Sequence, residues 1–215
     1  MSMWTNVGRR EMEKQGILIA VADDSLNGYE HNTLLENEGE TGFSNVSYHR
    51  GVDTDKDGRG VVGFDMDHDG DIDLYVANYR RRGTLYRNDI NELEDRNWLQ
   101  VKLIGLKSNR DAVGARLTLE AGGVKQIRDV RIGQAYLSGS TLVQHFGLAE
   151  TSSVDRLTVR WPSGLVQSFE NVPINARLQI VEGENELAIL SRALDEEERD
   201  ADEGEESSDV DAPNA

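Results

Sequence analysis

The densest group of chemically active side chains lies in GFDMDHDGDIDLYVANY, residues 63–79. It places five aspartates at alternate positions within nine residues: Asp65, Asp67, Asp69, Asp71 and Asp73. Calcium is a hard cation that takes about six to eight oxygen ligands, and a short loop with alternating carboxylates can supply many of them. Glycine at position 70 permits the tight turn that such a loop needs. The pattern predicts a calcium site in which Asp71 offers its backbone carbonyl and the other four aspartates offer carboxylates.

Electrostatics favours the same interpretation. Neighbouring carboxylates about 4 Å apart repel each other by about 1 kcal/mol in water, and by more where they are partly desolvated. A bound divalent cation reverses the sign of this interaction. We therefore expect the clustered aspartates to be stable when they coordinate a bound cation.

Three alternatives compete with a calcium loop between strands. An EF-hand carries a bidentate glutamate where this chain has Val76, and its flanks are helices, whereas VVGF and IDLYVANY resemble strands. Magnesium prefers fewer carboxylates and more water. An acidic surface turn without an ion does not account for five aspartates in this register.

A second aspartate run precedes the first. DTDKDGRG, residues 53–60, contains Asp53, Asp55 and Asp57 at the same alternate spacing. It has Val61 where a further acid would be needed. We predict a solvated turn here, with a weak second metal site as the alternative.

Composition restricts the classes of partner. The chain has 215 residues, a net charge of −17 and no cysteine, which excludes disulfides, thiolate nucleophiles and cysteine-ligated metals. Basic side chains gain binding energy by displacing the cations that surround nucleic-acid phosphates, and an acidic chain cannot do this. We therefore expect no nucleic-acid partner. The early apolar run ILIAVA, residues 17–22, is too short to span a membrane or to form the core of a signal peptide.

The sequence predicts that the elements which position the aspartates are β-strands. WLQVKLI places Leu99, Val101 and Leu103 on one side, and DRLTVRW does the same for Leu157, Val159 and Trp161. ARLTLEAGGVKQIRDVRI predicts a hairpin at Gly122-Gly123, because both glycines accept a positive φ, and WPSG predicts a further turn. Strands spaced about ten residues apart predict a sandwich or barrel.

Both ends of the chain differ from this pattern. NTLLEN (32–37) and GTLYRN (83–88) form a faint repeat 51 residues apart, a period typical of propeller blades. NELAILSRALDEEER has leucines at helical spacing, which predicts a short helix capped by Asn185. From residue 195 onward, eleven acidic residues and one basic residue give a net charge of −10, which predicts a disordered tail.

Several stretches resemble known families. LLENEGETGFSNVSYHRGV, DGRGVVGFDMDHDGDIDLYVANY and TLYRND resemble the FG-GAP/VCBS repeat of integrin-α-like propellers. SNRDAVGAR (108–116), HFGL (145–148) and RWPSG (160–164) resemble the ASPIC/UnbV domain. The two domains occur together in cartilage-acidic-protein-like proteins. The resemblance implies an incomplete FG-GAP/VCBS blade region at 1–95 and an ASPIC/UnbV β domain at 96–183. The helix and acidic tail predicted from the residues would then occupy 184–215.

The resemblance also implies a function. It suggests calcium at Asp65, Asp67, Asp69, Asp71 and Asp73, export to the cell surface or beyond, and adhesion or recognition of a protein or glycan. A propeller needs more blades than this chain can hold. The chain would then belong to a longer propeller protein, or assemble with copies or partners.

No motif in the sequence points to catalysis. Nucleophile-elbow, zincin and phosphate-loop motifs are absent from the chain. We interpret His145 as a half-buried strand residue with a satisfied hydrogen bond, against the alternative of a general base. We therefore predict a calcium-binding, non-catalytic recognition module. The alternative is an accessory part of a hydrolase or carbohydrate-active protein.

Overall fold

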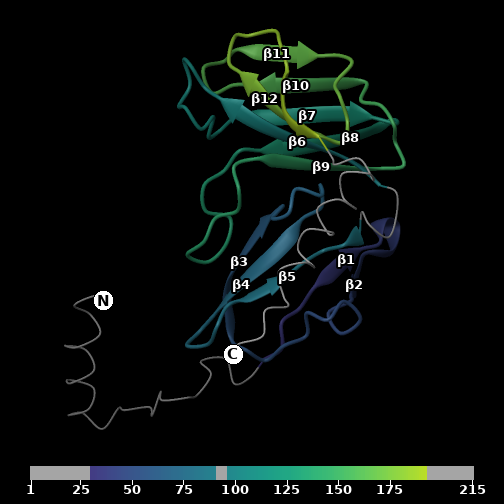
Figure 1. The fold of residues 1–215 in the computed structure, drawn as a ribbon, viewed down its shortest axis with the longest axis vertical. Helices are drawn as coiled ribbons and strands as arrows, with labels where there is room; N and C mark the ends of the chain where they lie inside the picture. Colours follow the sequence, from purple (N-terminus) through teal and green to yellow (C-terminus); the bar gives the residue numbers. More distant parts are fainter. Residues whose placement is uncertain (1–29, 91–95, 193–215) are drawn as a thin grey trace, which may run out of the picture. The chain divides into compact units, whose positions relative to one another are not determined.

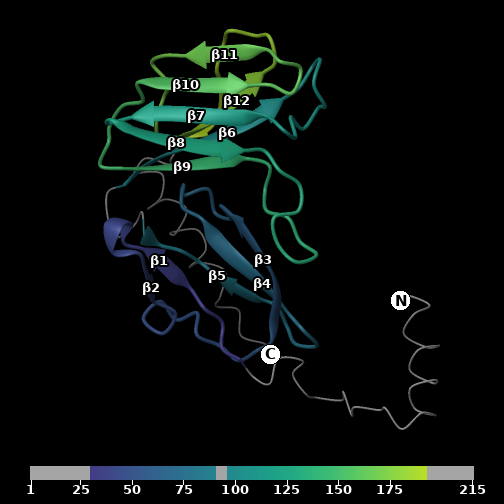
Figure 2. The ribbon, with the colours of Figure 1, turned by 180° about the vertical axis from the view of Figure 1, so that it is seen from behind.

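The computed structural model describes residues 30–90 and 96–192, and most of their regular structure is β-strand (Figures 1 and 2). The prediction of a mainly β fold is therefore confirmed. The acidic tail and the first apolar run lie outside the described residues. Within the described residues, no helix is long and apolar enough to cross a lipid bilayer.

Two small sheets precede the larger ones. A short 3-10 helix, η1 (Gly39–Thr41), joins β1 (Leu35–Asn37) to β2 (Phe43–Asn45) in an antiparallel pair. A three-stranded sheet follows, in the order β3 (Gly58–Phe64), β4 (Asp73–Asn78), β5 (Thr84–Tyr86). The aspartate loop, residues 65–72, joins β3 to β4, so the prediction that it bridges two strands is confirmed.

Two four-stranded sheets make up the C-terminal sandwich. The first has the order β11-β10-β7-β8, from β7 (Arg116–Ala121), β8 (Val124–Asp129), β10 (Arg156–Arg160) and β11 (Val166–Phe169). The second has the order β13-β12-β6-β9, from β6 (Asn97–Ile104), β9 (Gln144–Ala149), β12 (Ala176–Val181) and β13 (Ala188–Arg192). Strands β12 and β6 are parallel, whereas the other neighbours are antiparallel.

One hydrophobic core lies between these two sheets. Leu99, Val101 and Leu103 of β6 belong to the same buried cluster as Leu157 and Val159 of β10. The alternation predicted for both segments is therefore confirmed. The hairpin at Gly122-Gly123 is also present, with φ values of 55° and 76° at the two glycines.

Side chains of β8 close one edge of the sandwich. Strand β9 is the last strand of its sheet, which leaves outward-facing carbonyls that need donors. Gln126 Nε2 donates to the Gly147 carbonyl at 2.7 Å, and Arg128 Nε donates to the His145 carbonyl at 2.9 Å. The backbone of His145 is therefore held from the neighbouring sheet.

The predicted C-terminal helix is wrong. Residues 188–192 form β13, which pairs antiparallel with β12 and shifts register between Arg177 and Leu178. A helix of a few turns is marginal by itself in water. The open edge of β12 offers backbone hydrogen bonds instead, and these favour the extended conformation.

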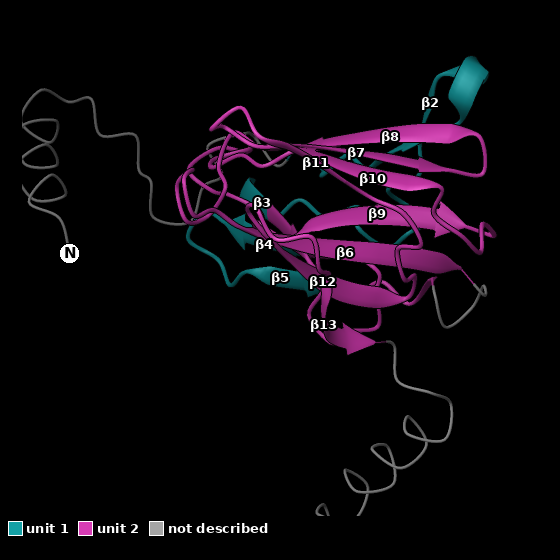
Figure 3. Cartoon of the chain, turned by 90° about the horizontal axis from the view of Figure 1, so that it is seen from above, with its two compact units in different colours: residues 1–61, 75–86 teal, residues 62–74, 87–215 magenta. Residues whose placement is uncertain are grey.

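The chain divides into two compact units (Figure 3). One comprises residues up to 61 together with 75–86, and the other comprises 62–74 together with the residues from 87 onward. The aspartate loop therefore lies in the same unit as the sandwich.

Candidate metal centre

Backbone hydrogen bonds shape the aspartate loop from within. The Asp65 carboxylate accepts the His68 N–H at 2.7 Å, and the Asp69 carboxylate accepts the Asp71 N–H at 2.9 Å. Aspartate is suited to such turns because its short side chain reaches the backbone two or three residues later. Gly70 has a φ of 93°, a conformation that side-chain-bearing residues rarely adopt.

Three of the five predicted carboxylates come together. Asp65, Asp67 and Asp73 each present an oxygen, and these atoms all lie within 4.8 Å of one another. Asp73 is fully buried, and its two oxygens accept the N–H groups of Met66 at 2.8 Å and Asn88 at 2.9 Å. These bonds fix its orientation, and each oxygen keeps a further lone pair.

Asp69 and Asp71 lie in the same loop but outside this group of three. Asp71 is buried, with 4% of its surface exposed. Burial raises the pKa of Asp69 to about 6, the Asp71 N–H opposes this shift, and the charges of Asp67, Asp65 and Asp73 add to it. Burial therefore favours the protonated form of Asp69, and the neighbouring carboxylates add to this effect.

A cationic side chain approaches the group from one side. Arg87 lies 3.8 Å from an oxygen of Asp67 and 2.5 Å from Asp89. Arg87 is half exposed, so solvent screens its pair with Asp67. This contact offsets only part of the charge of three clustered carboxylates.

The second sheet of the sandwich holds the loop from outside. Gln100 of β6 donates from Nε2 to the Asp65 carboxylate at 2.5 Å. His145 of β9 is hydrogen-bonded through Nε2 to the Gly70 carbonyl at 2.8 Å. The Trp98 indole fills the space beside Gly70, where an added Cβ would lie 1.9 Å from the ring. Sequence reasoning missed all three contacts, because Gln100 and His145 carry no motif that links them to an aspartate loop.

His145 holds the loop through its hydrogen bond to Gly70. Burial lowers the pKa of its imidazole. A neutral ring that is bonded to a carbonyl donates from Nε2. The interpretation of His145 as a half-buried strand residue with a satisfied hydrogen bond matches this arrangement.

The second aspartate run adopts a different arrangement. Asp53 pairs with the His31 ring at 2.7 Å, and buried Asp57 pairs with Arg59 at 2.5 Å. Asp55 is exposed. Among the described residues, Asp53, Asp55 and Asp57 do not form a group of three whose ligand atoms converge.

One comparison with known proteins gives a match. Residues 105–187 match the model of the family described as ASPIC and UnbV. No curated protein matches the chain. The matched segment includes strands β7 to β12 and therefore most of the sandwich. This part of the chain is similar to ASPIC/UnbV domains.

Proposed function

We propose that the chain is a calcium-binding, non-catalytic recognition module of an exported protein. The convergence of Asp65, Asp67 and Asp73 within 4.8 Å carries the calcium assignment. Three carboxylates, backbone carbonyls of the loop and water could together supply the six to eight or so oxygens that calcium takes. Magnesium fits less well, because it holds several waters and few carboxylates.

The recognition role is supported by similarity and by composition. The ASPIC and UnbV match covers most of the sandwich, and stretches between residues 34 and 89 resemble an FG-GAP/VCBS repeat of adhesion proteins. The net charge of −17 favours cations and basic surfaces over nucleic acid. Export and adhesion follow from the resemblance. The engagement of His145 with a backbone carbonyl supports a non-catalytic site.

Thermal unfolding tests this proposal. The full chain should melt at a higher temperature in calcium than in chelator, because a ligand that binds only the folded state stabilises it. At about 100 times Kd, this gain is about 2.7 kcal/mol. Asp67→Asn should reduce the increase, since it removes one charge from the group without removing a described hydrogen bond to the backbone.

Asp155→Asn is the matched control. Asp155 is an exposed aspartate of the same unit outside the group, and the variant should retain the full increase in melting temperature. A panel of chromogenic esters and glycosides should show no turnover. Identical melting curves in calcium and chelator would refute the metal assignment. Turnover that is lost in an aspartate variant outside the loop would favour a hydrolase.

A further inference from the structure

Three polar side chains form a row on the outer face of the second sheet. The strand register places Arg177 of β12 beside Gln100 of β6, and Gln100 beside His145 of β9. Their sequence neighbours Leu99, Val101, Ala176 and Leu178 are buried in the core. The row therefore faces away from the core, toward the segments that cross this sheet.

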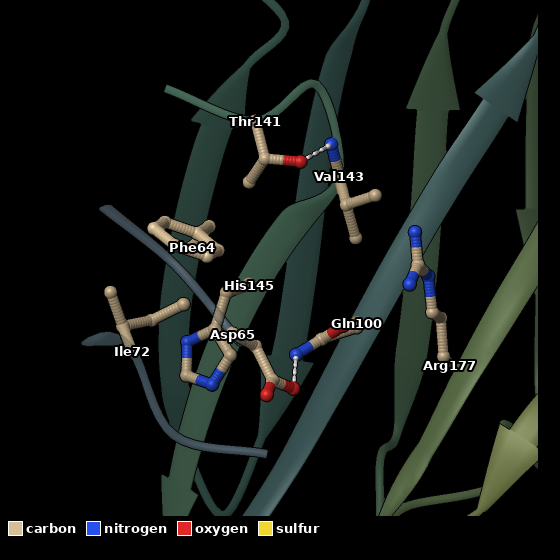
Figure 4. A pocket seen from close by; sticks show the side chains of 8 residues that line it. All are labelled: Phe64, Asp65, Ile72, Gln100, Thr141, Val143, His145 and Arg177. Carbon is tan, nitrogen blue, oxygen red and sulfur yellow. Dashed lines mark hydrogen bonds between the residues drawn. The ribbon is translucent and has the colours of Figure 1, made fainter. Parts of the chain in front are cut away.

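These crossing segments enclose a small pocket above the row (Figure 4). Its volume is about 140 Å³, and its walls combine the row with apolar side chains of Phe64, Ile72 and Val143. Thr141 and Asp65 complete the lining. The volume is suited to a group of a few heavy atoms that has one polar end and a short apolar stem.

Arg177 is the group in this pocket with unused binding capacity. Its Nε is buried and meets no acceptor among the described residues. Gln100 and His145 are engaged with the aspartate loop, to Asp65 and the Gly70 carbonyl. A buried donor on a cation is costly unless an acceptor reaches it. The side chain of Arg177 also lines the pocket, so an acceptor that enters the pocket can pair with the guanidinium.

The identity of the acceptor follows from the other walls. A carboxylate matches the planar guanidinium with two parallel hydrogen bonds, and its stem can lie against Val143 and Phe64. The Thr141 hydroxyl accepts the Val143 N–H at 3.2 Å and keeps its own proton to donate. A phosphate dianion fits less well, because the pocket has one guanidinium and Asp65 would repel a second charge.

We propose that this pocket binds a carboxylate through Arg177. The assignment names the ligand class for the recognition role and therefore rests on the proposed function. The two sites share one wall, Asp65, which lines the pocket and belongs to the group of three carboxylates. An ion at that group would reduce the repulsion between Asp65 and the incoming carboxylate, so binding should strengthen in calcium.

Nitrogen-15 NMR of the full chain tests the pocket directly. The Nε–H resonance of Arg177 is observed while propionate is added, with propionamide as the neutral probe of the same shape. Propionate should give a saturable shift, whereas propionamide and an equal concentration of sodium chloride should not. The titration is run in calcium and in chelator. Equal shifts from propionate and propionamide, or no saturable shift in calcium, would overturn the proposal.

Variants connect the binding to Arg177. Arg177→Met keeps a similar length without the charge and should weaken propionate binding by at least about tenfold, measured from amide shifts around the pocket. Arg177→Lys keeps the charge but lacks the planar fork, and should also weaken binding. Arg160→Met is the control, since Arg160 is exposed on the other sheet and outside the pocket. Wild-type affinity in well-folded Arg177→Met would contradict the assignment.

A second pair of probes tests whether the carboxylate belongs to a protein side chain or to a small free molecule. A blocked peptide with one glutamate should bind if the ligand is a protein side chain, and its glutamine counterpart should not. Binding of propionate alone would leave the pocket assigned to small free carboxylates.

The same samples separate this inference from the calcium proposal. Calcium binding without a carboxylate shift would refute the pocket and leave the calcium site intact. A saturable carboxylate shift without calcium binding would refute the calcium site and support the pocket.

Discussion

Glu182 joins three segments of the sandwich through one carboxylate. It accepts the backbone N–H groups of Leu106, Lys107 and Ser108 at 2.7–2.8 Å. The Ser108 hydroxyl lies 2.9 Å away, and the Ser163 hydroxyl is also bonded to it. Burial alone would raise the pKa of Glu182, but these hydrogen bonds outweigh it and lower the pKa to about 2. The carboxylate therefore stabilises the turn after β6 and the WPSG turn together.

Substitution of Glu182 tests this arrangement. Glu182→Ala leaves three N–H groups without their acceptor and should lower the melting temperature by several degrees at pH 7. Glu182→Gln should cost less, because its amide oxygen can still accept the N–H groups and the two hydroxyls can reorient. Urea unfolding of the three proteins measures the difference. A stability of Glu182→Ala equal to that of wild type would show that the hydrogen bonds contribute little.

The pKa of Glu182 also predicts a pH dependence. The group has an ordinary pKa of 4.5, which folding lowers to about 2. Its contribution is therefore fully present above pH 4.5 and is lost as the pH falls toward 2. The stability difference between wild type and Glu182→Gln should be larger at pH 7 than at pH 3. A difference that does not change between these values would contradict the assignment.

At the scale of elements, the aspartate loop and the second sheet depend on each other. Trp98 and Gln100 project from the side of β6 opposite the core, yet they are only 4% and 3% exposed. The contacts of Gly70 with Trp98 and of Asp65 with Gln100 account for this burial. Strand β6 is therefore covered on both faces where it lies beside the loop.

Gly70→Ala should disrupt this contact. The new Cβ would lie 1.9 Å from Trp98, and the φ of 93° adds strain. Gly164→Ala is a matched control, because Gly164 has a φ of 92° and no atom within 4 Å of an added Cβ. The control should lose about 1–3 kcal/mol of stability from backbone strain. Gly70→Ala should lose more in urea unfolding and should also weaken calcium binding. Equal losses in the two variants would argue against close packing of the loop on Trp98.

Local patterns in the sequence predict much of the sandwich. Alternation in WLQVKLI and DRLTVRW, and the paired glycines at 122 and 123, reflect the strand period and turn geometry, which depend on near neighbours. The strand at 188–192 is not predicted, because Leu187, Leu190 and Leu194 in and around it fit helical spacing. The edge of β12, which pairs with this strand, cannot be recognised from the stretch itself.

The candidate site also contains residues that a local pattern reveals and residues that it does not. The run of five aspartates and Gly70 can be recognised in the sequence because all of them lie in one short segment. Three of the five, Asp65, Asp67 and Asp73, bring their oxygens together. Gln100, His145 and Arg177 are brought to the site by the register of β6, β9 and β12. That register depends on the whole sheet, so no local pattern reveals it.

For the whole molecule, an ion at the candidate metal centre would affect the stability of the sandwich. The aspartate loop, residues 65–72, belongs to the same compact unit as the two large sheets. Ion binding at the loop should therefore stabilise the unit by mass action. Asp65 belongs to both the candidate metal centre and the lining of the proposed carboxylate pocket. Under both proposals, calcium would therefore also strengthen carboxylate binding.

Calorimetry on the full chain, freed of metal by chelator, tests directly whether the aspartate loop binds calcium. We expect a measurable heat of association with calcium and a weaker response to magnesium. The response to calcium should be diminished in Asp67→Asn and unchanged in Asp155→Asn. If calcium gave no heat of association at several temperatures, or if Asp67→Asn bound it as tightly as wild type, the aspartate loop would not be a calcium site.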